Sequence, residues 1–480
     1  MSYLFENYVE RPRLSPDTSF EHVKCGADFP SDFVKYRNCE YMFNHKLYSG
    51  DYARGKYLTL LVNQIEHECP YRTVPLNYFE TVTNKLESLL FNNNITVKTG
   101  DSARDKRIES LMLSCDWVHS IRKGVKNALI YGDSILKTYR RGVSALTPLS
   151  GFKVVDSSDK DLVKGVVLHE LLYDSEGTPT HIRILISSVG FEYERVYEYV
   201  GDSFSGKIGK PVRWKYRGRW IPVKGRYYFT EISDASTVQW LSLNTEKNLY
   251  YGSSCFDNIK QIVFHLERRL ATEAWVVDNH SAPLLTVSMQ SIQENELTGR
   301  QTLKVVDGKY LINHGEQDSN SFKYIEWDGK LDASKSVRDS LMSALYELSE
   351  LGRCFLSGEL SISNISEETL NNIIKTALDR AARILNDLYL PIRDSLYVLC
   401  RLNGIEVLKD DLNISFNIGQ VDDAKTIAQV CTELSTNAMM SRSTLLQKFF
   451  GYSAEDADEE LKKVSEERDK NKDIKIEEVV

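Results

Sequence analysis

Clustered carboxylates are the residues of this sequence whose types and spacing come nearest to chemistry, because converging carboxylates can hold the metal ions of a nuclease. The candidates are Asp422-Asp423, Glu367-Glu368 and the acidic run at 455–460. Each lies where we predict a helix to begin, and negative charge is stabilised there by the helix dipole. We interpret these carboxylates as helix-start residues and predict no catalytic site.

Other reactive motifs are also missing from the sequence. It contains no G-x-x-x-x-G-K-[ST] phosphate loop, no GxGxxG, no GxSxG and no HExxH. His67-Glu68-Cys69 is the tightest His/Cys group, but no second ligand pair stands at zinc spacing from it. The eight cysteines are scattered without a CxxC pair, as expected for reduced thiols. We therefore expect no metal, no cofactor and no enzymatic activity.

Composition and charge limit the class of protein further. The 480 residues are 42% hydrophobic and 27% charged, which is typical of a folded protein of several structural units. No apolar run approaches the ~20 residues of a membrane helix, and the start does not resemble a signal peptide, so we expect no membrane association. The net charge of −8 argues against a protein that grips DNA by neutralising phosphates.

The first half of the chain mixes helix and strand patterns. Residues 120–130 have helical periodicity, and Gly132-Asp133 follows as a turn signal. Residues 163–172 and 181–187 are rich in β-branched and apolar side chains around a turn, which predicts a hairpin. The tyrosines and tryptophans of this half could stack on bases, but antiparallel sheet packing is the commoner cause of such a pattern.

The second half is dominated by three helical patterns. Apolar faces predict helices over 253–278 and 333–351, with Gly352 ending the second. Ser366 is a suitable N-cap for a long third helix, in which Pro391 predicts a kink. Between the first two helices, residues 284–331 alternate strand patterns with turns and predict a small β-rich module. After a strand at 412–416, the last 60 or so residues have helical patterns only.

Four segments in a fixed order resemble portal proteins of tailed bacteriophages, especially those of siphophages with Gram-positive hosts. They are Ala128–Ser134, Tyr251–Ile259, Phe322–Leu331 and Asn437–Phe450. No single segment is specific, but their order over about 350 residues is characteristic. The resemblance implies an α+β fold and an elongated, ring-forming subunit without enzymatic activity.

The resemblance also implies a division of the chain into named parts. An α/β wing is followed by a two-helix stem, a small β-rich clip, a tunnel loop, a long kinked wing helix and an α-helical crown. The implied boundaries are wing 1–244, first stem helix 245–279, clip 280–331, second stem helix 332–352, tunnel loop 353–366, long wing helix and return strand 367–419, and crown with C-terminal tail 420–480.

In such a ring the tunnel loop would line the narrowest part of the DNA channel. Its small, polar or charged residues could touch DNA without holding it, and Gly352 and Pro391 would serve as hinges. The candidate channel residues are Arg353, Ser357, Gly358, Glu359, Ser361 and Asn364.

The resemblance further implies a set of partners and a location. Portal subunits form a closed ring, typically of twelve, at one vertex of the capsid. Double-stranded DNA passes through the ring, the terminase large subunit and then a head-completion adaptor bind to it, and the major capsid protein and scaffold surround it. The protein would be assembled in the host cytoplasm and reside in the virion.

Two alternatives compete with this hypothesis. One is another structural virion protein, such as a scaffold or capsid component, which would form shells or filaments. The other is a nucleic-acid-processing enzyme, which the missing phosphate loop and the acidic balance disfavour.

Overall fold

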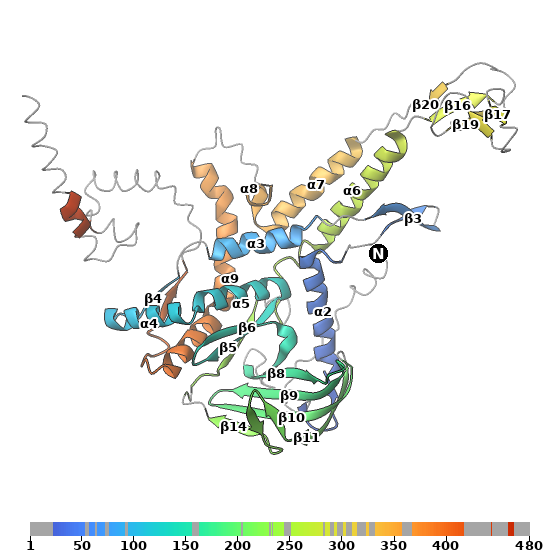
Figure 1. Ribbon diagram of the computed structural model, residues 1–480. Helices are drawn as coiled ribbons and strands as arrows, with labels where there is room; N and C mark the ends of the chain where they lie inside the picture. The colour runs from blue at the N-terminus through green and yellow to red at the C-terminus, as the bar shows by residue number, and fades with distance from the viewer. Residues whose placement is uncertain are drawn as a thin grey trace, which may run out of the picture. The chain divides into compact units, whose positions relative to one another are not determined.

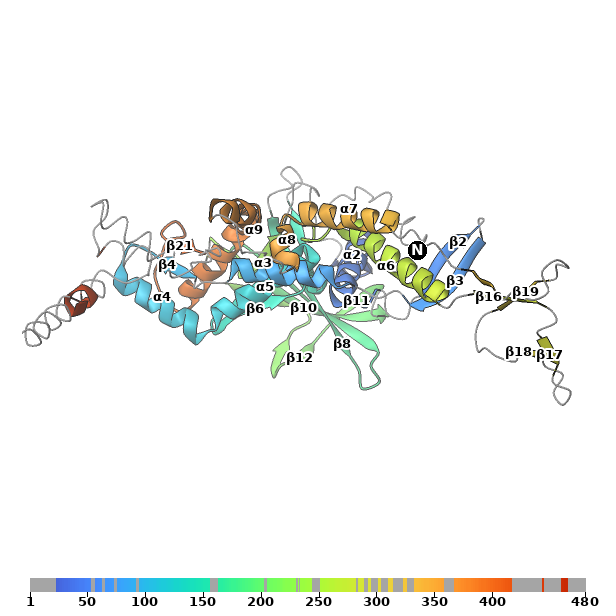
Figure 2. The same ribbon diagram turned by 90° about the horizontal axis from the view of Figure 1, so that it is seen from above.

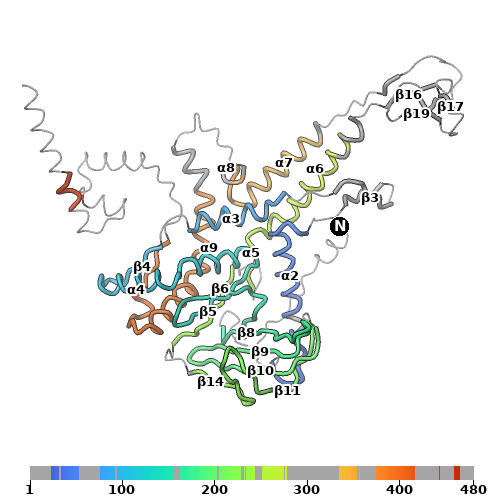
Figure 3. Tube along the Cα trace, in the orientation of Figure 1, coloured from blue at the N-terminus to red at the C-terminus, as the bar shows by residue number. Residues whose placement is uncertain are grey.

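The computed structural model describes most of the chain from residue 23 to residue 416, together with residues 443 and 459–464 (Figure 3). The chain divides into two compact units, Met1–Ile418 and Gly419–Val480, and the numbered helices and strands all belong to the first. Within it, the described residues exclude 53–56, 63–64, 73–75, 92–94, 156–162, 203–204, 230–231, 233, 244–250, 282–283, 289–291, 295–300, 304–309, 314–322, 326–331 and 358–366.

Three of the helices have capping residues suited to their ends. Ser31 caps the first helix with its hydroxyl oxygen, which accepts from the backbone N–H of Val34, and Asp101 caps α4 in the same way. Gly132 closes α5 in the left-handed conformation that a residue without a Cβ adopts readily. The helices are α2 (Asp32–Ser49), α3 (Tyr78–Leu90), α4 (Ser102–Ser114), α5 (Trp117–Tyr131), α6 (Lys260–Ser281), α7 (Asp332–Ser349), α8 (Gly352–Ser357) and α9 (Glu367–Leu402), with a 3-10 turn at Pro148–Ser150.

An antiparallel sheet forms the largest β structure (Figure 1). The hairpin predicted from sequence is confirmed, and the Asp174 carboxylate accepts two backbone N–H groups in its turn. The strands run in the order β1 (Asp28–Phe29), β11 (Gly206–Val212), β10 (Phe191–Gly201), β9 (Pro179–Ser188), β8 (Val163–Tyr173) and β7 (Gly151–Val155), and β14 (Arg226–Phe229) also pairs with β10.

A second, three-stranded sheet lies against helices and belongs to the main core. Its strand order is β15 (Val238–Ser242), β5 (Asp133–Tyr139) and β6 (Gly142–Leu146). Leu136 of β5, Leu129 of α5 and Leu396 of α9 are fully buried in one continuous apolar cluster. Smaller strand pairs are β2 (Tyr57–Val62) with β3 (Ile65–Arg72), β4 (Thr96–Lys98) with β21 (Asn413–Ser415), and β12 (Trp214–Tyr216) with β13 (Arg219–Ile221).

The two predicted stem helices are present as α6 and α7, which lie side by side in both views (Figures 1 and 2). Glu273 of α6 joins them by accepting from Arg338 at 2.9 Å and from Ser334 at 2.7 Å, both on α7. The first helix was expected from residue 253 but begins at Lys260. That expectation was wrong because the backbone N–H groups of residues 252, 253 and 255 bond to distant parts of the fold.

The described residues of the predicted β-rich module form five short strands. β16 (Leu284–Ser288) pairs in parallel with β19 (Tyr310–Asn313) and antiparallel with β20 (Lys323–Ile325). β17 (Ile292–Glu294) pairs with β18 (Gln301–Leu303). The sequence pattern located β16, β18 and β20, and it missed β17 and β19.

The segment predicted as a loop from Arg353 is helical in its first part. α8 covers Gly352–Ser357, so the expectation of a continuous loop over 353–366 was wrong there. Gly352 has a φ of +72°, which allows the chain to turn sharply between α7 and α8. Residues 358–366 lie outside the described residues.

α9 is one helix of 36 residues with Pro391 inside it. Figure 1 shows that it changes direction along its length. Proline supplies a physical reason for such a bend, since it donates no N–H and its ring crowds the preceding turn. As predicted, the helix ends just before Asn403-Gly404, where Gly404 has a φ of +73°.

Candidate functional site

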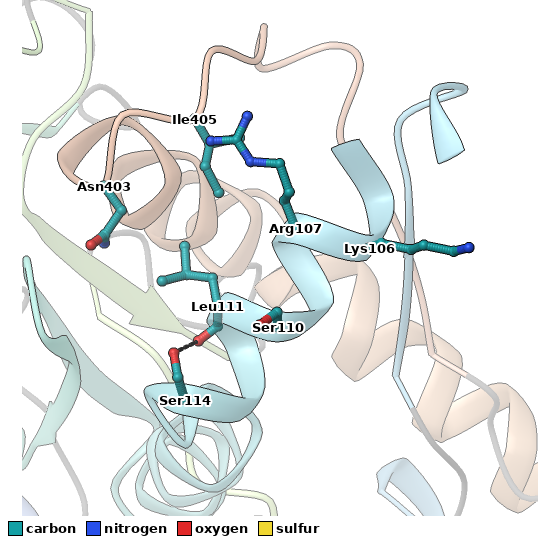
Figure 4. A pocket seen from close by; sticks show the side chains of 7 residues that line it. All are labelled: Lys106, Arg107, Ser110, Leu111, Ser114, Asn403 and Ile405. Atoms are coloured by element: carbon teal, nitrogen blue, oxygen red, sulfur yellow. Dashed lines mark hydrogen bonds between the residues drawn. The ribbon is translucent and has the colours of Figure 1, made fainter. Parts of the chain in front are cut away.

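The part of the chain that the structure describes holds no cluster of metal-ligating side chains. Among those residues, no group of three His, Cys, Asp or Glu side chains could hold a metal ion, and no helix could cross a membrane. A surface depression of about 450 Å³ lies between α4 and the segment after α9, and Figure 4 shows its Lys106 and Arg107 side chains pointing in different directions. It contains no pairing of a nucleophile with a base. Its lining residues are Lys106, Arg107, Ser110, Leu111, Ser114, Asn403 and Ile405.

A buried acid instead organises the centre of the molecule. Asp133 is the first residue of β5, and its side chain is fully buried. One carboxylate oxygen accepts from two side chains of α2, and the other from two side chains of β15. The donors are Arg37 Nη2 at 3.1 Å, Tyr41 Oη at 2.7 Å, Trp240 Nε1 at 3.0 Å, Ser242 Oγ at 2.6 Å and the backbone N–H of Gly252 at 3.0 Å. We call these six residues the Asp133 cluster.

The Asp133 cluster is charged in the folded protein. Burial by itself would raise the pKa of Asp133, but the nearby Arg37 and Lys153 cations and the hydrogen bonds of the cluster hold it below its usual value. A buried carboxylate with this many donors is a satisfied anion, and removing one partner leaves the opposite charge uncompensated in the interior. The cluster therefore fixes α2, β5 and β15 relative to one another.

Two glycines bring the Ala128–Ser134 and Tyr251–Ile259 segments into direct contact. A Cβ on Gly252 would lie 1.9 Å from the carbonyl oxygen of Gly132, so no larger residue fits without moving the backbone. Cys255 donates its backbone N–H to the Leu129 carbonyl at 2.9 Å. These bonds hold the chain before α6 in a non-helical path, and two of the segments that carried the resemblance thus meet at one place.

A second buried charge joins the middle of α9 to the end of α7 and to the segment before α6. Arg380 of α9 is 9% exposed and donates to the carbonyl of Ser349, the last residue of α7, and to the carbonyl of Cys255 before α6. Both are carbonyls at positions where the backbone does not continue a helix, so the guanidinium satisfies oxygens that would otherwise be buried without a partner. We call Arg380, Ser349 and Cys255 the Arg380 contact.

The first turns of α6 carry two more buried charged residues. Lys260 donates to Asn44 of α2 at 2.6 Å and forms an ion pair with Asp257. Glu267 accepts from the Tyr52 hydroxyl and from the backbone N–H of Leu76, yet burial raises its pKa above the usual value. The first turns of α6 are therefore held by polar contacts to Asn44, Tyr52 and Leu76 within an apolar core.

The residues predicted to line the channel do not gather in a site that the structure describes. Arg353 lies in the first turn of α8 with its side chain exposed, and Ser357 ends that helix. Gly358, Glu359, Ser361 and Asn364 lie outside the described residues. Of the proposed hinges, Gly352 is in the left-handed conformation between α7 and α8, and Pro391 is inside α9.

The sequence reasoning missed the two buried charged groups. Gly132-Asp133 was interpreted as a turn signal, which is correct for Gly132 but does not reveal that the acid faces inward. Arg380 was one of several cations in a long amphipathic helix, and its signal was its position beside Ala377 and Ala381, small residues of the buried face. A charged residue on the apolar face of a helix was the signal that could have revealed the buried Arg380.

Comparison with known families shows to which one the chain belongs. The family model described as phage portal protein, SPP1 Gp6-like, matches residues 35–473. The chain is therefore a member of this phage portal protein family, whose proteins are structural components of the virion. A comparison with curated proteins finds no match.

Solved structures similar to this chain include two from gene transfer agent particles. One is titled "Virion of native gene transfer agent (GTA) particle", with 10% identity, a TM-score of 0.42, and coverage of 78% of this chain and 89% of that chain. The other is titled "Neck of empty GTA particle computed with C6 symmetry", with 8% identity, a TM-score of 0.41, and coverage of 77% and 88%.

Proposed function

We propose that this chain forms a closed ring, typically of twelve subunits, at one vertex of a phage capsid, and that double-stranded DNA enters and leaves through it. The observation that carries the proposal is the pairing of α6 and α7 as two adjacent helices whose bases are anchored by buried charges, in a chain that belongs to the portal family. Exposed apolar residues on this pair, such as Val277 and Val337, would be covered by neighbouring subunits.

We assign the wing, stem, clip and crown of the subunit to the helices and strands as follows. The wing comprises the N-terminal sheets and α9, the stem is α6 with α7, and the clip is the strand module between them. The clip would bind the terminase large subunit and later a head-completion adaptor, while the wing would face the major capsid protein and scaffold. The crown is assigned to residues 420–480.

Contact with DNA in the channel is assigned to the segment from Arg353 to Ser366. Because α8 occupies its first part, the contact would come from 358–366, with Arg353 able to make a weak phosphate contact at the base. Gly358, Ser361 and Asn364 are small or polar, and Glu359 would repel phosphates, so DNA could slide past without being held.

Imaging of the purified chain by negative-stain electron microscopy tests this function. We expect rings with a central hole about as wide as duplex DNA. Deleting 359–364 should leave the rings intact and impair packaging or DNA retention. Filaments, closed shells or a strict monomer would contradict the proposal and favour another structural virion protein. ATPase or nuclease turnover with magnesium that resists removal of contaminants would favour an enzyme.

A further inference from the structure

The segment from β11 to β14 is strongly basic. Residues 206–229 contain eight Lys and Arg residues and no Asp or Glu, although the chain as a whole has a net charge of −8. All eight side chains are exposed. We call them the basic hairpin surface: Lys207, Lys210, Arg213, Lys215, Arg217, Arg219, Lys224 and Arg226.

The fold presents this charge outward. β12 and β13 form a two-residue hairpin in which Arg217 and Gly218 both have positive φ, the geometry of a type I′ turn. On one face of the hairpin, Tyr216 donates to Glu170 of the main sheet at 2.7 Å. On the other face, Lys215 lies directly opposite Trp220, whose side chain is 52% exposed.

Most cations of this surface have no acidic partner among the residues that the structure describes. Within the described part of the chain, only Lys207 forms an ion pair, a 3.8 Å contact with the exposed Asp28. Glu170 and Glu194 of the sheet both pair with Arg183, whereas Glu198 of β10 lies beside Gly209 and reduces the net charge near Lys210. Arg213 lies over the Trp220 ring at 4.5 Å, which holds its guanidinium in place without neutralising it.

The eight cations lie on neighbouring strands and turns, on both faces of the hairpin, with no acid between them in the sequence. Such a concentration of positive charge is complementary to a polyanion. Protein interfaces deplete lysine at their centres, whereas Lys and Arg are common ligands of nucleic-acid phosphates. We propose that the basic hairpin surface binds the phosphate backbone of duplex DNA without sequence preference. This inference rests on the proposed function for its choice of polyanion, and it adds a contact outside the channel loop.

The test uses the full-length protein and a fluorescent duplex of random sequence. Anisotropy would be measured from about 50 to 200 mM salt, the range over which phosphate contacts weaken steeply. The variant Arg213→Gln/Lys215→Gln/Arg219→Gln/Lys224→Gln removes half of the surface charge and keeps Arg217 in its turn. The matched control, Lys85→Gln/Lys123→Gln/Arg140→Gln/Arg141→Gln, removes four exposed cations elsewhere.

Wild type and control should bind with similar affinity, within about twofold, and the hairpin variant should bind about tenfold or more weakly at 0.1 M salt. The salt slope of the hairpin variant should be smaller by about one for each phosphate that its side chains no longer neutralise. Equal affinity of all three proteins, equal loss in both variants, or no binding by wild type would overturn the proposal. Tighter binding of polyglutamate than of DNA would overturn it too, in favour of an acidic protein partner.

A second variant and a separate measurement keep the outcomes distinct. Lys210→Gln/Lys224→Gln lies outside β12 and β13 and should lower the salt slope by about two, even if the fourfold variant does not fold. Ring formation would be imaged on the same samples. If the protein forms rings but the hairpin variants bind DNA as well as wild type, the proposed DNA contact is wrong and the proposed function stands. If the hairpin variants lose DNA affinity but the protein forms no rings, the proposed function is wrong and the DNA contact stands.

Discussion

Arginine has opposite roles in two regions of this molecule. Arg37 and Arg380 are buried, and each is fixed by oxygens of segments distant in the sequence. Arg213 and Arg219 are exposed on the basic hairpin surface and have no acidic partner among the described residues. The difference teaches that burial, and not residue type, decides whether a charge holds the fold together or is available to a partner. Substitutions in the two regions should therefore affect different measurements.

The largest effect on stability is expected at the Asp133 cluster. Asp133→Ala leaves the buried Arg37 with Glu40 as its remaining counter-charge and removes the acceptor of five donors, so we expect a loss of about 3–5 kcal/mol in the free energy of unfolding. Denaturant unfolding measures it. Asp174→Ala, an exposed acid that accepts two turn N–H groups, is the control and should cost about 1 kcal/mol. Similar losses at both positions would contradict the assigned role.

The second-largest loss of stability is expected at the Arg380 contact. Arg380→Met keeps most of the side-chain volume but removes two hydrogen bonds from a charged donor, at an expected cost of about 3 kcal/mol. Arg383 supplies a matched control three residues along the same helix, because it pairs with Glu350 at the surface. Arg383→Met should cost under about 1 kcal/mol. If the two thermal midpoints fall equally, the Arg380 contact does not hold α9 to α7 and to the segment before α6.

Close approach of the two glycine segments gives a third prediction. Gly252→Ala would place a methyl group against the carbonyl of Gly132, and we expect a cost of about 1–3 kcal/mol as the backbone shifts. Gly177→Ala is a control for strain without a clash, because no atom lies near its Cβ position but its φ of +81° strains any side chain, and it should cost only about 1 kcal/mol. An unchanged unfolding midpoint for Gly252→Ala would show that the segments are not in contact.

Acid should weaken the Asp133 cluster in a defined direction. The pKa of Asp133 is lowered in the folded state, so its contribution is complete above the unfolded value of about 3.9 and is lost as pH falls through the folded value. Asp133→Asn cannot titrate. The stability difference between wild type and this variant should therefore shrink from about pH 6 to about pH 3. A constant difference would mean that Asp133 is not charged when folded.

The smallest effect on stability is expected at the basic hairpin surface. Removing four exposed, unpaired cations should change the free energy of unfolding by less than about 0.5 kcal/mol, or raise it slightly through relief of repulsion. Thermal unfolding of the fourfold glutamine variant measures this. A loss of several kcal/mol would place these cations with the buried ones and end the contrast between the two regions.

Much of the fold could be predicted from the sequence because it follows periodicity. The β8–β9 hairpin, the two paired helices and the long helix containing Pro391 came from apolar spacing and turn residues. The start of α6 could not be predicted, since tertiary backbone bonds near Gly252 override helical spacing. The buried charges could not be predicted from the periodic pattern alone. Asp133 and Arg380 are matched by partners far along the chain, and the net charge of −8 conceals a local stretch with no acid.

The mass of the intact assembly tests the central claim most directly. Native mass spectrometry of the full-length protein should give one dominant closed species of about twelve copies of the 55.0 kDa chain, unchanged on dilution, with a ring of the same symmetry in images. A monomer at all concentrations, or an open ladder of masses that grows with concentration, would contradict the assignment of this chain as the subunit of a portal ring.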